Sequence, residues 1–261
     1  MNELDFKALP SSIKKYVNNL SYTVDDIGKS DSIVYIFDDY ILKISNLSFD
    51  IKNEIKIAKA LQGKLPIPEL LVSEIQENKI YLLKRKIKGK MLCDEEYMQN
   101  PDLLFKLATD AVKVLWSVDI SNLILQDTAQ TMYDFGKNKN PDCFDEMDSF
   151  TKNGFQSFEE ILAYLRQNKP NNDLVLTHGD FCLPNIICDG EKFVGFIDLG
   201  LMGIDNRYHD IAILYRSIKY NFRGDYGKAY PGFEEEKLFT MLNIKKEEEK
   251  MKYFLLLDEL L

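Results

Sequence analysis

Hydrophobic residues in the first ninety positions recur at two different spacings, and these predict helices alternating with strands. Helical spacing predicts a short helix over residues 11–20 and a longer one over 49–62, which Gly63 ends. Strand-like runs cover residues 21–27, 33–37, 40–44, 70–75 and 79–83. Short polar turns separate these runs, so we expect antiparallel hairpins in this part of the chain.

The apolar pattern stops at residues 84–90, Lys-Arg-Lys-Ile-Lys-Gly-Lys, and a different organisation follows. Asn100 and Pro101 fit the N-cap and first position of a helix. Ser157 to Glu160 form a capping box, which predicts a helix through Gln167. Residues 134–154 read as irregular, whereas helical spacing predicts further helices from His209 and over 246–260. The second part of the chain is therefore expected to be mainly helical.

One predicted hairpin interrupts this helical part. Apolar runs over residues 174–176 and 186–188 are followed by an Asp-Gly turn and a returning run over 193–197. An Asp-Gly pair between two apolar runs is a strong hairpin signal. Asn185 would then precede one strand and Asp198 would follow its partner, so the two should lie side by side.

Composition narrows the possible partners. The 261 residues carry 42 acidic and 33 basic side chains, a net charge of −9, which disfavours nucleic acid as the main partner. The negative field mildly favours a cationic substrate, although for net charge by itself solubility is the preferred explanation. No apolar stretch is long enough to span a membrane, and the polar, acidic N-terminus is no signal peptide. The four cysteines, Cys93, Cys143, Cys182 and Cys188, are interpreted as thiols in a reducing, cytoplasmic compartment; a disulfide is the disfavoured alternative.

Asp180, Asn185 and Asp198 together suggest phosphoryl transfer. Such a reaction needs a carboxylate that accepts a proton from the attacking hydroxyl, and oxygen ligands for magnesium. Asp180 would be the base, and Asn185 and Asp198 the metal ligands. Loop Asp and Asn residues also cap turns, which is the ordinary alternative for any one of them.

These residues also carry a family resemblance. His178-Gly179-Asp180, then Asn185 and the run Ile-Asp-Leu-Gly around Asp198, resemble the signature of aminoglycoside phosphotransferases and their kinase-like relatives. The similarity extends almost end to end and looks closest to aminoglycoside 3'-phosphotransferases. It implies an α+β, two-lobed, protein-kinase-like fold, with a small β-rich lobe over residues 1–84, a hinge over 85–90 and a larger, mainly helical lobe over 91–261.

The resemblance also implies a nucleotide site. Lys43 would hold phosphates and be steadied by Glu54; without the downstream motif, a lysine reaching water and a solvated glutamate would be preferred. The loop with Gly28 and Ser30 would cover the phosphates, although on its own its single glycine favours an ordinary hairpin turn. The resemblance further implies that the main chain of Arg85 and Ile87 contacts the purine base of the nucleotide. This hinge is unusually basic, and a solvated charge run is the alternative.

The substrate site implied by the resemblance is acidic. It draws on Asp258, Glu259, the Leu261 carboxylate, Arg216 and an acidic loop containing Asp142, Asp145, Glu146 and Asp148. A charged surface loop is an equal alternative for the last group. Asp210 is expected to brace the catalytic loop, and His178 to brace it rather than to act as a base.

The predicted function is therefore transfer of the γ-phosphoryl group of ATP or GTP, with Mg²⁺, to a hydroxyl of a cationic aminoglycoside, giving antibiotic resistance. The 3' hydroxyl is favoured, as is a monomer that binds neither nucleic acid nor membrane. One alternative is a kinase of another hydroxylated small molecule, such as choline, methylthioribose, homoserine or a macrolide. The other is a nucleotide-binding protein without useful turnover, which the presence of all the reactive positions disfavours.

Overall fold

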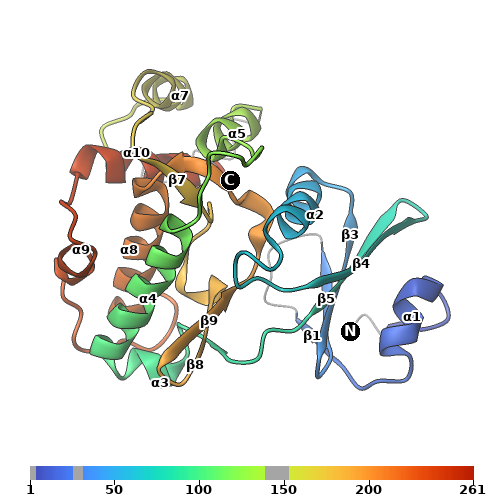
Figure 1. The fold of residues 1–261 in the computed structure, drawn as a ribbon. Coiled ribbons are helices and arrows are strands. Elements are labelled where there is room, and N and C mark those ends of the chain that lie inside the picture. Colours follow the sequence, from blue (N-terminus) through green and yellow to red (C-terminus); the bar gives the residue numbers. More distant parts are fainter. Residues whose placement is uncertain (1–3, 26–31, 139–152) are drawn as a thin grey trace. The chain divides into compact units, whose positions relative to one another are not determined.

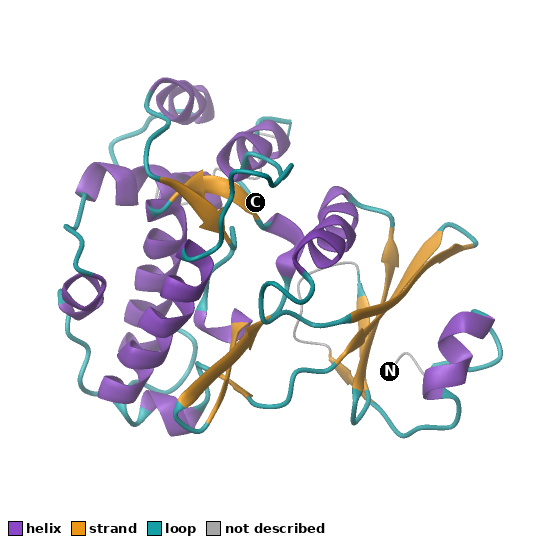
Figure 2. Cartoon of the chain, viewed as in Figure 1, coloured by secondary structure: helices purple, strands orange, loops and turns teal. Residues whose placement is uncertain are grey.

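The computed structural model describes residues 4–25, 32–138 and 153–261. The chain divides into two compact units, Met1–Lys90 with Ile187–Gly200 and Met91–Ile186 with Leu201–Leu261. The predicted lobes were continuous in sequence, whereas the first unit also includes the segment Ile187–Gly200. The α+β class is confirmed, with a small antiparallel sheet in the first unit and mainly helices in the second (Figure 2).

The first unit is built around a five-stranded antiparallel sheet with the strand order β1-β2-β3-β5-β4. Its elements are α1 (Ser11–Val17), β1 (Thr23–Asp25), β2 (Ile33–Ile36), β3 (Tyr40–Asn46), α2 (Phe49–Leu61), β4 (Leu70–Gln76) and β5 (Lys79–Arg85). Most predicted strands are confirmed, but β5 extends two residues beyond its predicted end. Lys84 and Arg85 therefore belong to a strand, although Lys84 begins the basic run 84–90 and Arg85 was placed in the predicted hinge.

The two faces of this sheet bury different helices. Leu42 and Leu83 lie in a core with α1, whereas Leu82 lies with Ile51 of α2 in a second core. Lys43 is directly opposite Leu82 in the register of β3 and β5. Because opposed residues of an antiparallel pair share a face, the Lys43 side chain lies on the α2 face.

The predicted hairpin after residue 185 is present. β8 (Ile186–Asp189) and β9 (Lys192–Phe196) are neighbours in a small sheet with the order β6-β8-β9, where β6 is Lys90–Met91. Gly190 has φ +54 at the turn, a left-handed conformation that suits glycine. Asp198 follows β9 and precedes the 3₁₀ helix η3 (Leu199–Leu201).

The second unit is mainly helical (Figure 1). Its helices are α3 (Glu95–Met98), α4 (Pro101–Trp116), α5 (Thr128–Gly136), α7 (Phe158–Gln167), η2 (Leu183–Asn185), α8 (Tyr208–Arg223), α9 (Lys237–Leu242) and α10 (Glu248–Asp258). Two short strands, β7 (Leu174–Thr177) and β10 (Gly203–Asn206), pair antiparallel and frame the loop that carries Asp180. α10 packs on α8, so the last residues of the chain are held against the helix that carries Asp210 and Arg216.

Local signals in this unit act as the sequence predicts. The Asn100 side chain accepts a hydrogen bond from the Leu103 N–H at 3.3 Å, and the Ser157 hydroxyl accepts one from the Glu160 N–H at 3.2 Å. Helices α3, α5 and α9 were not predicted, and α5 includes the first three residues of the stretch read as irregular. No helix among the described residues has the length and apolar character needed to cross a membrane.

Candidate active site

Lys43 and Glu54 meet in the first unit, as expected. Lys43 Nζ lies 3.5 Å from Glu54 Oε2, on a strand in the middle of the sheet, with 12% of its side chain exposed. It is therefore no edge lysine reaching into water. Burial opposes its charge, but Glu54, Asp198 and Asp50 outweigh this and raise the pKa of the Lys43 ammonium. Lys43 is thus held as a cation close to carboxylates.

A second lysine, which the sequence analysis missed, binds the same glutamate. Lys84 Nζ donates a hydrogen bond directly to Glu54 Oε1, and only 11% of the Lys84 side chain is exposed. Burial of Glu54 favours its neutral form, but Lys84 and Lys43 outweigh it and lower the pKa of this carboxyl. The detectable signal was the alternation Ile80, Leu82, Lys84, which continues one strand face.

Asp198 lies at the edge of this cluster in an uncommon backbone conformation. Its φ is +58°, its carboxylate is 4.0 Å from Lys43 Nζ, and 58% of its side chain is exposed. A left-handed residue other than glycine is strained and points to a functional constraint. The flanking chain is fixed, because Phe196 N donates to Pro66 O at 2.9 Å and Asn53 Nδ2 to Gly200 O at 2.9 Å.

Two charged side chains of the linking segment are paired on the surface. Arg85 Nε lies 2.9 Å from Glu69 Oε2, and Lys88 Nζ lies 2.9 Å from Asp39 Oδ1. The Arg85 N–H also donates to Glu69 O at 2.9 Å, so any main-chain contact from Arg85 to a base has to be made by its carbonyl. Ile87 is half-buried in the same segment. Gly28 and Ser30, the predicted phosphate loop, lie outside the described residues.

In the second unit, the loop His178-Gly179-Asp180 is fixed by a buried carboxylate. Asp210 accepts hydrogen bonds from the His178 N–H at 2.8 Å and the Gly179 N–H at 3.0 Å. Gly179 has φ +84°, and a Cβ there would lie 2.5 Å from Leu201 O, so only glycine fits. His178 is fully buried, and its Nδ1 accepts from the Asp180 N–H at 3.4 Å. These contacts agree with bracing roles for Asp210 and His178.

Asp180 and Asn185 face one another across this loop. Asn185 Nδ2 donates to both the main-chain oxygen and Oδ2 of Asp180, each at 2.9 Å. Ser217 Oγ accepts a hydrogen bond from the Leu183 N–H at 3.0 Å, which fixes the start of η2, the helix that ends at Asn185. Because the amide nitrogen of Asn185 serves Asp180, its carbonyl oxygen is the atom suited to a cation.

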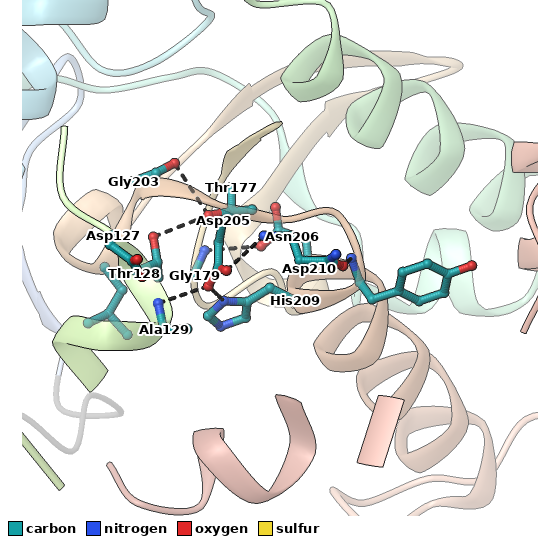
Figure 3. A network of polar contacts seen from close by, with 12 residues as sticks. Asp127, Thr128, Ala129, Thr177, Gly179, Gly203, Asp205, Asn206, His209 and Asp210 are labelled. Atoms are coloured by element: carbon teal, nitrogen blue, oxygen red, sulfur yellow. Dashed lines mark hydrogen bonds and ion pairs between the residues drawn. The ribbon is translucent and has the colours of Figure 1, made fainter. Parts of the chain in front are cut away.

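A buried polar network lies beneath the loop (Figure 3). Asp205 accepts from the Ala129 N–H at 2.8 Å, and its Oδ2 is 2.8 Å from His209 Nδ1. His209 is fully buried and stacks on Phe254. Burial opposes its charged form, yet Asp205 outweighs burial and raises the pKa of His209. The network ties the start of α8 to α5, β10 and α10.

Two residues assigned to the substrate site bind each other. Arg216 of α8 donates a hydrogen bond to Asp258 Oδ2 at the end of α10, and their side chains are 23% and 17% exposed. Burial raises the pKa of the Asp258 carboxyl, Arg216 lowers it, and Asp180 raises it again. The net effect is a raised pKa of the Asp258 carboxyl, because burial outweighs the pairing with Arg216. Glu259 and Leu261 follow directly, and the Leu261 side chain is 41% exposed.

The other residues of the predicted acidic site lie outside the described residues: Asp142, Asp145, Glu146 and Asp148. Within the described parts of the chain, no group of three or more His, Cys, Asp or Glu side chains could hold a metal ion alone. Magnesium typically takes one or two carboxylates and completes its shell with phosphate and water oxygens. Asp198 offers an exposed carboxylate and Asn185 an amide oxygen, so their chemistry suits that ion.

Comparison with known proteins gives a consistent result. The family described as "Phosphotransferase enzyme family" matches residues 22–239. An aminoglycoside 3'-phosphotransferase of Niallia circulans is 30% identical over 96% of this chain and 96% of its own. The enzyme of the same name from Enterococcus faecalis is 31% identical over 95% of this chain and 96% of its own.

Solved structures agree on the fold. The aminoglycoside phosphotransferase APH(3'')-Id from Streptomyces rimosus superposes with a TM-score of 0.76 at 19% identity, covering 99% of each chain. Its complex with ADP and streptomycin superposes with a TM-score of 0.74 at 20% identity, also covering 99% of each chain. The predicted protein-kinase-like fold is therefore confirmed.

Proposed function

The chain belongs to the phosphotransferase enzyme family, and from this premise we propose that it is an aminoglycoside 3'-phosphotransferase giving antibiotic resistance. It would transfer the γ-phosphoryl group of a nucleoside triphosphate to a ring hydroxyl. The observation that carries the proposal is identity of 30% and 31% to two enzymes of that name over almost the whole chain. Similarity that extends through the C-terminus supports a shared substrate class, beyond a shared kinase core.

Asp180 is the proposed catalytic base. It is fixed by the Asn185 amide and by the loop that Asp210 braces, which suits a carboxylate that must orient one hydroxyl. Accepting the hydroxyl proton as the oxygen attacks phosphorus is the role of the corresponding carboxylate in phosphoryl transfer. His178 is fully buried in the loop, which supports a bracing role for it.

The proposed donor is ATP or GTP with Mg²⁺. Lys43 would bind its phosphates, Arg85 and Ile87 its base through their main chain, and Gly28 and Ser30 would lie in the covering loop. Asn185 and Asp198 are the proposed magnesium ligands. The ion would neutralise charge that develops on the transferred group.

The proposed acceptor is held by charge. Asp258, Glu259 and the Leu261 carboxylate would meet ammonium groups of the aminoglycoside, with Asp145 and Glu146 as further partners. Arg216 would act through Asp258, because its cation repels an ammonium but fixes that carboxylate. We further propose a cytoplasmic monomer, since nucleoside triphosphate donors are available in that compartment.

A panel of acceptors tests the proposal. Nucleotide turnover with Mg²⁺ is measured with kanamycin, choline, methylthioribose, homoserine and a macrolide, with ATP and GTP in turn. Turnover only with kanamycin supports the proposal. Turnover only with another acceptor keeps the kinase chemistry but rejects the aminoglycoside, and nucleotide binding without any product rejects the enzyme.

A further inference from the structure

Glu54 is the counter-ion of two largely buried lysines, and its contacts with them differ. Lys84 donates a direct hydrogen bond to Oε1, whereas Lys43 Nζ stays 3.5 Å from Oε2. Oε2 is buried and has no hydrogen-bond partner among the described residues. The glutamate is therefore fixed mainly by Lys84, although Lys43 is the lysine assigned to the phosphates.

The register of the sheet explains how both lysines reach one carboxylate. Lys43 lies opposite Leu82, and Lys84 follows Leu82 by two positions on the same strand. Residues two apart on a strand share a face, so both side chains extend toward α2, which carries Glu54. Only 12% of the Lys43 side chain and 11% of the Lys84 side chain are exposed.

The charges of Lys43, Lys84 and Glu54 explain why a second lysine is useful when phosphate binds. A phosphate that binds Lys43 competes with Glu54 for its ammonium. If Lys43 were the only counter-ion, drawing it toward phosphate would leave a buried carboxylate without compensation, which is strongly unfavourable. With Lys84 in place, Glu54 stays neutralised when Lys43 shifts. Lys43 then keeps its charge free for an anion, while Lys84 alone compensates the buried carboxylate.

We propose that Lys84 is a positioning residue for the nucleotide: it holds and neutralises Glu54, and thereby releases Lys43 to bind phosphate. This rests on the proposed function for the identity of the ligand, a nucleoside triphosphate. Lys84 acts through Glu54 and is not assigned a contact with the nucleotide. Lys84 lies on β5, two residues after Leu82 and directly before Arg85.

The test measures binding of Mg-ATP by calorimetry and steady-state KM and kcat, in full-length protein. The variants are Lys84→Met, Lys84→Gln and Lys84→Arg, with Lys79→Met as a matched control because Lys79 is an exposed lysine on the same strand. We expect Lys84→Met and Lys84→Gln to weaken Mg-ATP binding and raise its KM by about tenfold, while kcat changes less. Lys84→Arg, which still pairs with Glu54, should stay near the parent.

A Glu54→Gln background separates the mechanisms. There, Lys84→Met should have little further effect, because the carboxylate it serves is absent. An undiminished loss in that background would mean direct contact with the nucleotide and overturn the proposal. Unchanged Mg-ATP binding in Lys84→Met and Lys84→Gln would also overturn it, whatever their melting temperatures. If the parent binds Mg-ATP but phosphorylates no aminoglycoside, the proposed acceptor is wrong. Mg-ATP binding by parent and variants still tests the proposed role of Lys84.

Discussion

The side-chain amide of Asn185 donates a hydrogen bond to the Asp180 carboxylate at 2.9 Å. One contact therefore joins the proposed base to a proposed magnesium ligand. The pairing directs the amide nitrogen toward Asp180, so the amide oxygen is the atom whose chemistry suits a metal ion. Asn185 thus has two proposed roles, and the Mg²⁺ requirement of a variant reports on metal binding.

Asn185→Ala should raise the Mg²⁺ concentration that gives half-maximal turnover by about tenfold or more, because one of few protein oxygens around the ion is lost. Titration of activity with Mg²⁺ at saturating nucleotide measures this. Asn168→Ala, an exposed asparagine at the end of α7, is the control. An unchanged Mg²⁺ requirement would remove Asn185 from the metal site.

Asp198 has a strained backbone and is also a proposed metal ligand. Two replacements distinguish the effect of the strain on stability from the effect of the lost ligand on activity. Asp198→Asn tolerates φ +58° and should keep the melting temperature while activity falls steeply. Asp198→Val should lose activity and also about 1–3 kcal/mol of unfolding free energy, because a β-branched residue is poorly tolerated at that φ. Chemical denaturation and turnover measure the two effects. Equal stability of both variants would contradict the strain.

Arg216 and Asp258 form a largely buried pair. Replacing one partner should therefore lower the free energy of unfolding more than replacing both. Arg216→Met should lower the free energy of unfolding by about 3 kcal/mol, since it leaves a carboxylate without its counter-ion. Adding Asp258→Leu should restore part of that loss but still raise the aminoglycoside KM. Arg223→Met, on the same helix but exposed, is the control. Additive losses in the double variant would contradict the coupling.

His209 should make stability depend on pH. Its pKa in the folded chain is raised above 6.5 by Asp205, so its protonated form stabilises the fold fully below pH 6.5. This stabilisation is lost as pH rises through the raised folded value. The difference in unfolding free energy between parent and His209→Gln should therefore shrink with rising pH. A difference that stays constant from about pH 5 to 9 would show that the histidine does not titrate in this range.

The sequence predicts the fold well where periodicity and local signals agree. Lys43 and Glu54 are found in contact, and the hairpin before Asp198 is present. Lys84 was missed because a run of basic residues conceals the strand alternation that continues to Arg85. Its partner depends on the register between β3 and β5 and on α2, which are long-range features that no local pattern encodes.

For the proposed substrate residues too, the sequence predicts which residues take part, whereas packing decides how they pair. The acidic C-terminus could be predicted by resemblance, but the pairing of Asp258 with Arg216 depends on α10 packing against α8. Short helices such as α9 were missed because six residues give too little periodicity for detection. What the sequence conveys is residue type and order; which buried charges share a partner is decided by packing.

The most direct test of the central claim is the position and origin of phosphate on kanamycin. The product formed with Mg-ATP is analysed by mass spectrometry and NMR, alongside a 3'-deoxy aminoglycoside and the Asp180→Asn variant. The account predicts a 3'-phosphate, no product from the 3'-deoxy compound, and a kcat lowered by about 10²–10⁴-fold in the variant. Phosphorylation of the 3'-deoxy compound, or equal kcat in variant and parent, would contradict it.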